Sequence, residues 1–110
     1  MKRGEIWTVA GGADYVGNPR PAIILQSDKF DATASITVCP LTSAPVKGAE
    51  PARFAIPPTP LNGLRAHSQA MVDKISTLPK DKVGRRIGRL DAAEIMTLNQ
   101  HVAIFLGLAE

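Results

Sequence analysis

Residues 19–25 constrain the fold of this chain more than any other segment. Pro19 and Pro21 fix the backbone φ angle at about −65°, and each proline pushes the residue before it towards extended geometry. The four residues from Ala22 to Leu25 are all apolar, which predicts a strand buried on both faces. Arg20 is therefore expected at the start of a buried strand, as a rigidly held cation suited to binding a phosphate. A solvated charge at a strand end is the alternative interpretation.

Length and composition favour a single domain that covers residues 1–110. Hydrophobic residues make up 45% of the 110 residues and charged residues 21%, which is ordinary for a globular protein. The net charge of +3 weakly favours an anionic partner. No apolar run approaches the roughly 20 residues of a bilayer span, so we expect no membrane segment. Cys39 is the only cysteine; we expect a buried structural thiol, and cytoplasmic localisation fits this cysteine usage.

Hydrophobic periodicity predicts a β-rich body. The expected strands are short and are separated by segments rich in Gly, Pro, Asp and Asn. They cover residues 5–10, 22–26, 36–41, 53–56 and 67–75. Residues 77–80 are expected to close the last strand. Short strands followed by a terminal helix predict a small, curved antiparallel sheet or a partial barrel.

A C-terminal helix is predicted by its cap and by its apolar stripe. Asp91 and Glu94 have the spacing of a capping box, and Gly107 is suited to end the helix. His101 is expected roughly opposite the apolar stripe and exposed. The stripe consists of apolar residues at helical spacing: Ile95, Leu98, Val102, Phe105 and Leu106.

The polar residues give no signature of metal or nucleotide chemistry. His67 and His101 have no partner at metal-ligand spacing, and one cysteine is too few for a structural zinc site, so we expect no metal or cofactor. The chain has no phosphate-binding loop and no nucleophile elbow. A basic run before the helix is interpreted as a solvated face, with a contact surface for a nucleic-acid backbone as the alternative. It contains Lys80, Lys82, Arg85, Arg86 and Arg89.

Six blocks of this sequence, in the same order and at compatible spacing, resemble those of the MazF/PemK toxin family. The blocks are RGEIW at 3–7, RPAIIL at 20–25, VCPLTS at 38–43, Ser68 with MVDKISTL at 71–78, IGRL at 87–90 and FLGL at 105–108. The resemblance implies a small SH3-like antiparallel β-barrel with a C-terminal helix, of the MazF/PemK/CcdB type. It further implies a homodimeric, metal-independent endoribonuclease that cleaves single-stranded RNA at short sequences.

The same resemblance implies catalytic roles for Arg20 and Thr42. Cleavage in this family proceeds by attack of the ribose 2′-OH on the adjacent phosphorus, which leaves a 2′,3′-cyclic phosphate and a 5′-OH. Such a reaction needs two proton transfers and hydrogen-bond donors for the charge on the phosphorane. Arg20 can supply the donors, and Thr42 offers a hydroxyl to a phosphate oxygen. The residue pattern alone favours the other interpretation, in which Thr42 is a strand-end residue that bonds its own backbone.

Further positions follow from the PemK branch, in which an arginine and an aspartate on the late strand act as acid and base. The aspartate falls on Asp73, but the arginine position is Met71, which favours the mechanism based on Arg20 and Thr42. Asp73 is expected to be a base, an RNA contact or a structural residue. The first loop, 11–17, is shorter than in the family. The predicted substrate-binding residues are Asn18, Ser43, Ser68 and Lys74.

The expected partners also come from the resemblance. They are single-stranded RNA, a second copy of the chain, and a cognate antitoxin with an acidic disordered segment that blocks the active site. DNA is expected to be contacted only through the antitoxin. The alternative hypothesis is a non-catalytic, CcdB-like toxin or interaction module on the same barrel, which binds a protein target such as gyrase.

Overall fold

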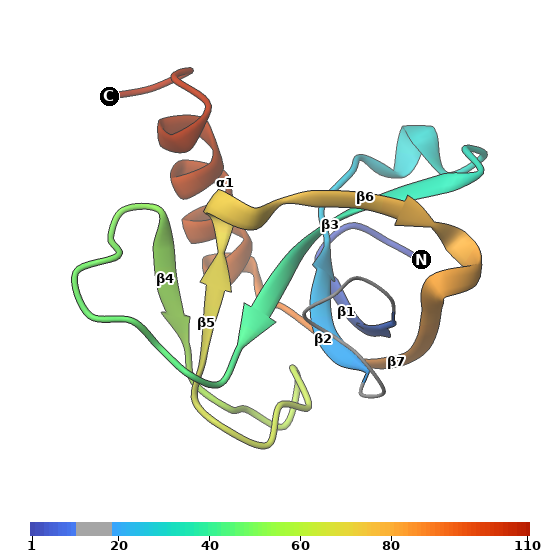
Figure 1. Ribbon diagram of the computed structural model, residues 1–110, viewed down its shortest axis with the longest axis horizontal. Coiled ribbons are helices and arrows are strands. Elements are labelled where there is room, and N and C mark those ends of the chain that lie inside the picture. Colours follow the sequence, from blue (N-terminus) through green and yellow to red (C-terminus); the bar gives the residue numbers. More distant parts are fainter. Residues whose placement is uncertain (11–18) are drawn as a thin grey trace.

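The computed structural model describes residues 1–10 and 19–110. They form a seven-stranded sheet, three 3₁₀-helices and one α-helix (Figure 1). The strands are β1 (Glu5–Val9), β2 (Arg20–Ile24), β3 (Ser35–Thr42), β4 (Arg53–Ile56), β5 (Ser68–Met71), β6 (Ser76–Pro79) and β7 (Val83–Arg89). The helices are η2 (Asp28–Phe30), η3 (Val72–Lys74), η4 (Lys80–Lys82) and α1 (Ala92–Phe105).

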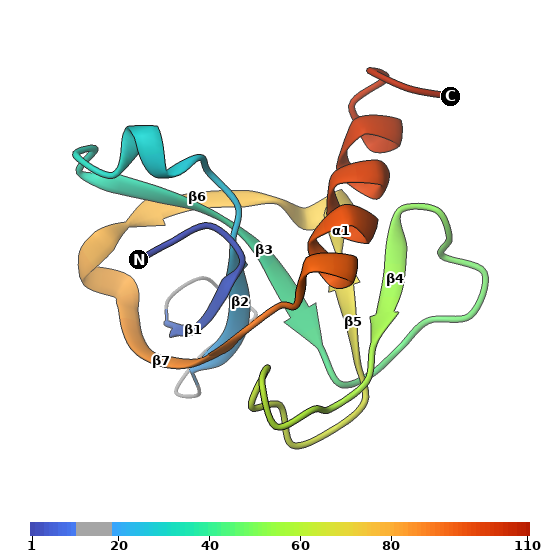
Figure 2. The same cartoon turned by 180° about the vertical axis from the view of Figure 1, so that it is seen from behind.

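All strand pairs are antiparallel, in the order β4-β5-β3-β2-β1-β7, and β6 adds a second partner to β3. The long strand β3 joins the two halves, because its C-terminal end pairs with β5 and its N-terminal half pairs with β6. The sheet curls around itself in one half and lies open beside α1 in the other (Figures 1 and 2). The predicted β-rich barrel with a C-terminal helix is confirmed.

Two apolar clusters fill the two halves. The larger cluster lies between α1 and the β3–β4–β5 part of the sheet, and it includes Leu41, Phe54 and Leu98. The smaller cluster fills the curled half and includes Val9, Ile24 and Val38. Residues 22–24 of β2 are buried and contribute to both clusters. The prediction of a strand buried on both faces is confirmed for residues 22–24, whereas the predicted end at residue 26 is wrong because β2 ends at Ile24.

The predicted strand 67–75 is wrong in its second half, and so is the predicted closure at 77–80. Strand β5 ends at Met71, η3 follows, and β6 begins at Ser76. Because β3 changes partner along its length, the chain must leave one half of the sheet and enter the other, and η3 makes this bend. Residues 77–79 therefore belong to a strand that pairs with residues 35–37 of β3.

The basic run at 80–89 contains a strand that the sequence analysis did not assign. Strand β7 pairs with β1, and Trp7 lies opposite Arg86. Arg85, Arg86 and Arg89 are exposed while Val83 and Ile87 are partly buried. The strand was missed because its three exposed arginines obscure the hydrophobic pattern of the apolar residues that attach it to the barrel.

The predicted capping box of α1 is confirmed. The Asp91 carboxylate accepts the Glu94 N–H at 2.7 Å, and the Glu94 carboxylate accepts the Asp91 N–H at 3.0 Å. Gly107 has a positive φ of 77°, which suits a residue that ends a helix. No helix in the described part of the chain is both long enough and apolar enough to cross a membrane.

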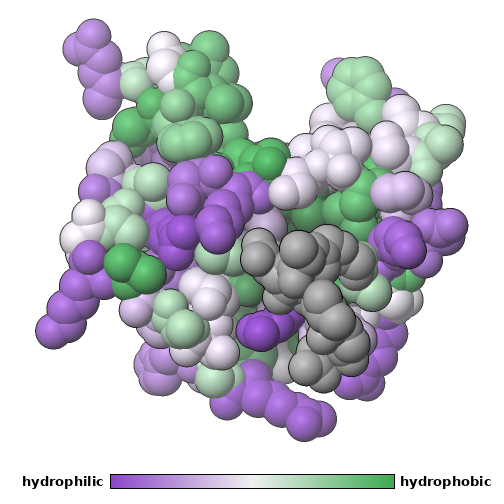
Figure 3. Space-filling model, in the orientation of Figure 1, coloured by the Kyte–Doolittle hydropathy of each residue, from purple (hydrophilic) through white to green (hydrophobic). Residues whose placement is uncertain are grey.

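The apolar stripe of α1 is buried only in its first half. Leu98 is fully buried, whereas Phe105 and Leu106 are 47% and 58% exposed. Figure 1 shows the cause, since the last turns of α1 extend beyond the sheet. Hydrophobic side chains gather at this end of the helix (Figure 3).

The predicted exposure of His101 is wrong. Its ring stacks on Phe54 with the ring centroids 4.8 Å apart, and its Nδ1 lies 2.5 Å from the carbonyl oxygen of Pro51. His101 lies three residues after Leu98, which places it beside the buried stripe and against β4 rather than opposite the stripe.

Candidate functional site

Arg20 and Thr42 lie at adjoining ends of neighbouring strands. In the ladder between β2 and β3, Ala22 is opposite Pro40. Arg20 and Thr42 each lie two residues beyond this pair, towards the same end of the two antiparallel strands. Arg20 is exposed, and its side chain has no hydrogen-bond or ion-pair partner within residues 1–10 and 19–110. The structure therefore places the two predicted catalytic residues at the same end of neighbouring strands.

The Thr42 side chain bonds the local backbone. Its Oγ1 accepts the N–H of Ala44 at 3.1 Å, which is the strand-end role considered in the sequence analysis. This contact uses a lone pair and leaves the hydroxyl hydrogen available. Thr42 is only partly buried. Its hydroxyl can therefore still donate to an anionic oxygen that lies beside Arg20.

A cavity of about 460 Å³ is lined by the chain neighbours of these two residues, although Arg20 and Thr42 themselves are not part of its wall. Pro19 and Pro21, the neighbours of Arg20, form part of its wall, and so does Ser43, the neighbour of Thr42. Residues 63–66 and residues 85–87 of β7 form much of the remaining wall. The volume lies in the range of ordinary small-ligand sites.

The predicted substrate-binding serines both line this cavity, in different ways. Ser43 is exposed. Ser68 is only 6% exposed, and its hydroxyl donates to the Ala66 carbonyl at 3.0 Å. Ser43 is therefore free to meet a ligand, whereas Ser68 holds the loop that forms the wall.

Asn62 fixes the loop that forms one wall of the cavity. This side chain is fully buried. Its Oδ1 accepts the N–H groups of Thr59 at 2.9 Å and Leu64 at 3.0 Å, and its Nδ2 donates to the Pro57 carbonyl at 2.9 Å. One side chain thus satisfies three backbone groups of an irregular segment.

Two glycines let this loop approach β7 closely. A Cβ at Gly63 would lie 2.4 Å from the Ile87 carbonyl oxygen, and a Cβ at Gly88 would lie 2.5 Å from the backbone of Asn62. Gly63 also has a positive φ of 68°, which strains other residues. The backbone of Arg89 bonds the Leu61 carbonyl at 3.1 Å. The two walls of the cavity are therefore fixed relative to each other.

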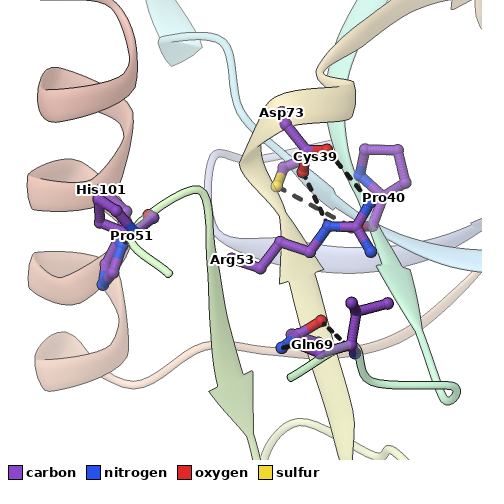
Figure 4. A network of polar contacts seen from close by, with 8 residues as sticks. Cys39, Pro40, Pro51, Arg53, Gln69, Asp73 and His101 are labelled. Atoms are coloured by element: carbon purple, nitrogen blue, oxygen red, sulfur yellow. Dashed lines mark hydrogen bonds and ion pairs between the residues drawn. The ribbon is translucent and has the colours of Figure 1, made fainter. Parts of the chain in front are cut away.

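Asp73 forms an ion pair that the sequence analysis did not foresee. Its carboxylate accepts two bonds from Arg53, with Nε–Oδ1 at 2.9 Å and Nη2–Oδ2 at 3.1 Å (Figure 4). Hydrogen bonding to Arg53 lowers the pKa of Asp73. The register explains the contact, because Arg53 lies opposite Met71 on the neighbouring strand. No local motif links Arg53 and Asp73, because the two residues are far apart in the chain and meet only through the strand pairing.

Asp73 does not lie with Arg20 and Thr42. Thr42 is opposite Gln69, and Asp73 follows Gln69 by four residues, beyond the other end of β5. Lys74, another predicted substrate-binding residue, is exposed beside Asp73 and has no bonded side-chain partner among the described residues. The structure thus separates these two residues from the edge that carries Arg20.

Gln69 was missed by the sequence analysis. Its amide oxygen accepts the Val46 N–H at 3.2 Å and its amide nitrogen donates to the Val46 carbonyl at 3.3 Å, so it holds the loop that follows Thr42 (Figure 4). Gln69 is only 8% exposed. No local motif announces such a residue, because its role depends on which loop folds over the strand.

The arginines of β7 have different surroundings. Arg86 forms an ion pair with Glu5 at 3.1 Å. Burial opposes ionisation of Glu5, but hydrogen bonds from the Lys2 N–H and the Trp7 indole, together with the charge of Arg86, outweigh it and lower the pKa of Glu5. The side chain of Arg85 has no such partner in the described part of the chain, and it lines the cavity.

Cys39 is fully buried, as predicted, and burial raises the pKa of its thiol to about 12. Within residues 1–10 and 19–110, no group of three or more His, Cys, Asp or Glu side chains is placed to hold a metal ion. The predicted substrate-binding residue Asn18 and the loop at 11–17 lie outside the described residues.

Comparison with known proteins identifies the family of this chain. Residues 2–106 match the family described as PemK-like, MazF-like toxin of type II toxin–antitoxin systems. The chain is 42% identical over 109 residues to a probable endoribonuclease MazF of Mycolicibacterium smegmatis, covering 99% of each chain. It is 34% identical over 118 residues to endoribonuclease MazF9 of Mycobacterium tuberculosis, covering 98% of each chain.

Solved structures share the fold. A mycobacterial endoribonuclease in complex with its cognate antitoxin superposes with a TM-score of 0.82 at 24% identity, over 100% of this chain and 98% of that one. A MazE–MazF structure from Deinococcus radiodurans gives a TM-score of 0.74 at 20% identity, over 97% and 95% of the two chains. At these identities the likeness shows a common fold.

Proposed function

This chain belongs to the PemK-like, MazF-like toxin family of type II toxin–antitoxin systems, and from that premise we propose that it is an endoribonuclease that cleaves single-stranded RNA without a metal ion. Two relatives that align over nearly the whole chain are named endoribonucleases. The observation that carries the proposal is the placement of Arg20 and Thr42 at the same end of neighbouring strands, with their chain neighbours lining an open cavity.

The reaction is attack of a ribose 2′-oxygen on the adjacent phosphorus. The 2′-oxygen loses its proton and bonds to phosphorus, the bond from phosphorus to the 5′-oxygen breaks, and the 5′-oxygen takes up a proton. The products are a 2′,3′-cyclic phosphate and a 5′-OH, and neither water nor an oxidant is consumed in this step.

Arg20 and Thr42 are assigned to the phosphorane. Charge builds on its equatorial oxygens, and fixed donors that face this charge lower the barrier. The Arg20 guanidinium offers paired N–H donors and a full positive charge, and the Thr42 hydroxyl offers a further donor. A guanidinium is protonated at neutral pH, so Arg20 suits charge stabilisation and does not suit removal of the 2′ proton.

The same premise gives the partners. We expect the chain to act as a cytoplasmic homodimer and to be inhibited by a cognate antitoxin, since a mycobacterial endoribonuclease of the same fold has been solved with its antitoxin. An acidic antitoxin segment would be attracted by the net charge of +3. DNA would be reached only through the antitoxin.

The test is cleavage of a long single-stranded RNA in EDTA, followed by mapping of 5′-OH ends. The purified wild-type chain is expected to cut at defined sequences. Arg20→Ala is expected to lose roughly 100-fold or more of this activity, the loss typical of a removed transition-state donor. Arg89→Ala removes an exposed arginine of β7 that lies outside the cavity wall, and it is the matched control. Intact RNA at high concentrations of wild-type protein would instead favour the non-catalytic, CcdB-like alternative.

A further inference from the structure

The cavity lined by the chain neighbours of Arg20 and Thr42 has walls of two kinds. Pro19, Pro21 and Leu64 provide apolar surface, while Arg65 and Arg85 provide positive charge. A nucleotide has the same two parts, a flat base that packs on apolar surface and polar edges and phosphates that accept hydrogen bonds. The cavity is therefore suited to a nucleotide in its chemistry as well as in its volume of about 460 Å³.

The guanidinium groups of Arg65 and Arg85 have hydrogen-bond donors available for a ligand. Neither side chain has a hydrogen-bond or ion-pair partner in the described part of the chain, in contrast to Arg86, which is held by Glu5 at 3.1 Å. A guanidinium has donors only and no acceptor. It therefore pairs best with a base edge that presents two neighbouring acceptors.

The backbone of the cavity walls is held in place by hydrogen bonds and close contacts. Arg65 follows the loop that Asn62 holds through three side-chain hydrogen bonds. Arg85 lies on β7, where its N–H bonds the Thr8 hydroxyl at 2.9 Å. Gly63 and Gly88 keep the loop and the strand in close contact. Because both arginines project from fixed backbone, they can discriminate between bases as well as attract phosphates.

We propose that this cavity receives one nucleotide of the RNA next to the cleaved phosphate, and that Arg65 and Arg85 select a base with two adjacent acceptors. Guanine presents O6 and N7 in this way, and cytosine presents O2 and N3. Adenine and uracil present no two adjacent acceptors. The inference rests on the proposed ribonuclease function, because that function supplies the RNA and the scissile phosphate.

The experiment is cleavage of a single-stranded RNA pool with a randomised centre, with sequencing of the cut ends. The wild-type chain is expected to prefer guanine or cytosine at one position next to the cut, and the sequenced ends distinguish the two bases. Arg65→Ala and Arg85→Ala are expected to reduce this preference roughly tenfold at that position alone. Arg89→Ala, an exposed arginine on the same strand, is the control and should leave every position unchanged.

Two results would overturn the inference. One is an unchanged base preference in both variants. The other is a uniform loss of cleavage across all sequences with a reduced dependence on salt, since this pattern identifies phosphate contacts rather than base selection.

A binding measurement separates failure of this inference from failure of the proposed function. Fluorescein-labelled RNA pentamers AAGAA, AACAA, AAAAA and AAUAA are titrated with Arg20→Ala protein and followed by anisotropy. Tighter binding of the first two supports base selection even if the wild-type chain cleaves no RNA. Equal affinities for all four would exclude it, whether or not the wild-type chain cleaves.

Discussion

Asn62 offers a sharp test of how the site is built, because one buried side chain supports the loop that forms a cavity wall. Its amide accepts the N–H groups of Thr59 and Leu64 and donates to the carbonyl of Pro57, each within 3.0 Å. Replacement by alanine leaves three backbone groups without these partners. At about 1 kcal/mol for each lost hydrogen bond, Asn62→Ala should lower the free energy of unfolding by about 3 kcal/mol.

This loss converts to a large shift in melting temperature. An unfolding entropy of about 2.1 cal/mol/K per residue gives about 0.23 kcal/mol/K for the 110 residues of this chain. The expected shift is therefore a decrease of about 13 °C. Calorimetry at one fixed protein concentration measures it, since association would make the melting temperature depend on concentration.

The matched control is Asn99→Ala, which makes the same substitution on the exposed surface of α1. Its free energy of unfolding should stay within about 0.5 kcal/mol of the wild-type value. A decrease of less than about 4 °C for Asn62→Ala, or an equal effect at both positions, would refute the view that Asn62 anchors the loop.

Three further predictions follow from single contacts. Asp73→Asn should lower the free energy of unfolding by about 1 kcal/mol because it weakens the pair with Arg53. The rate of RNA cleavage by this variant, measured well below the melting temperature, should stay within about threefold of the wild-type rate. A loss of about 100-fold would instead assign Asp73 to catalysis. Since Arg53 lowers the pKa of Asp73 in the folded state, urea titrations should find this stability difference constant above about pH 5 and lost as the pH falls through the folded pKa. A difference that does not decrease at all as the pH is lowered would contradict the ion pair. Cys39, whose pKa is raised to about 12 by burial, should resist alkylation by iodoacetamide at pH 8 in the folded protein and react once it is unfolded in urea, so rapid reaction of the folded protein would place the thiol at the surface.

Local sequence signals predicted the elements that depend on local physics. The start of α1 was predicted from the capping box of Asp91 and Glu94, and the buried strand was predicted from the apolar run at 22–24. Both predictions were possible because a cap and a buried strand are visible in a few consecutive residues. The break at 72–74 was not predictable in this way. It exists because β3 changes its pairing partner between residue 38 and residue 41, and no residue within 67–75 reports that change.

The residues of the candidate site likewise differ in whether a local sequence signal identifies them. Arg20 was indicated by its flanking prolines and the apolar run after it, Thr42 came from the resemblance, and the antiparallel pairing of β2 and β3 then explains why both lie at the same end of these strands. Arg53 and Gln69 carry no motif, because each acts through a contact between segments that are distant in the chain. The wrong prediction for His101 could have been avoided from the sequence, because a residue three positions after Leu98 lies on the same side of the helix as Leu98.

The central claim is that Arg20 and Thr42 act on one phosphate, and a double-mutant cycle on RNA cleavage tests it most directly. Single-turnover rates would be measured in EDTA for the wild type, for Arg20→Ala, for Thr42→Ala and for the double variant. If both side chains stabilise the same phosphorane, the double variant should lose much less than the product of the two single losses, because groups that act as a unit are not additive. Wild-type rates in either single variant, or losses that multiply fully, would contradict a shared site.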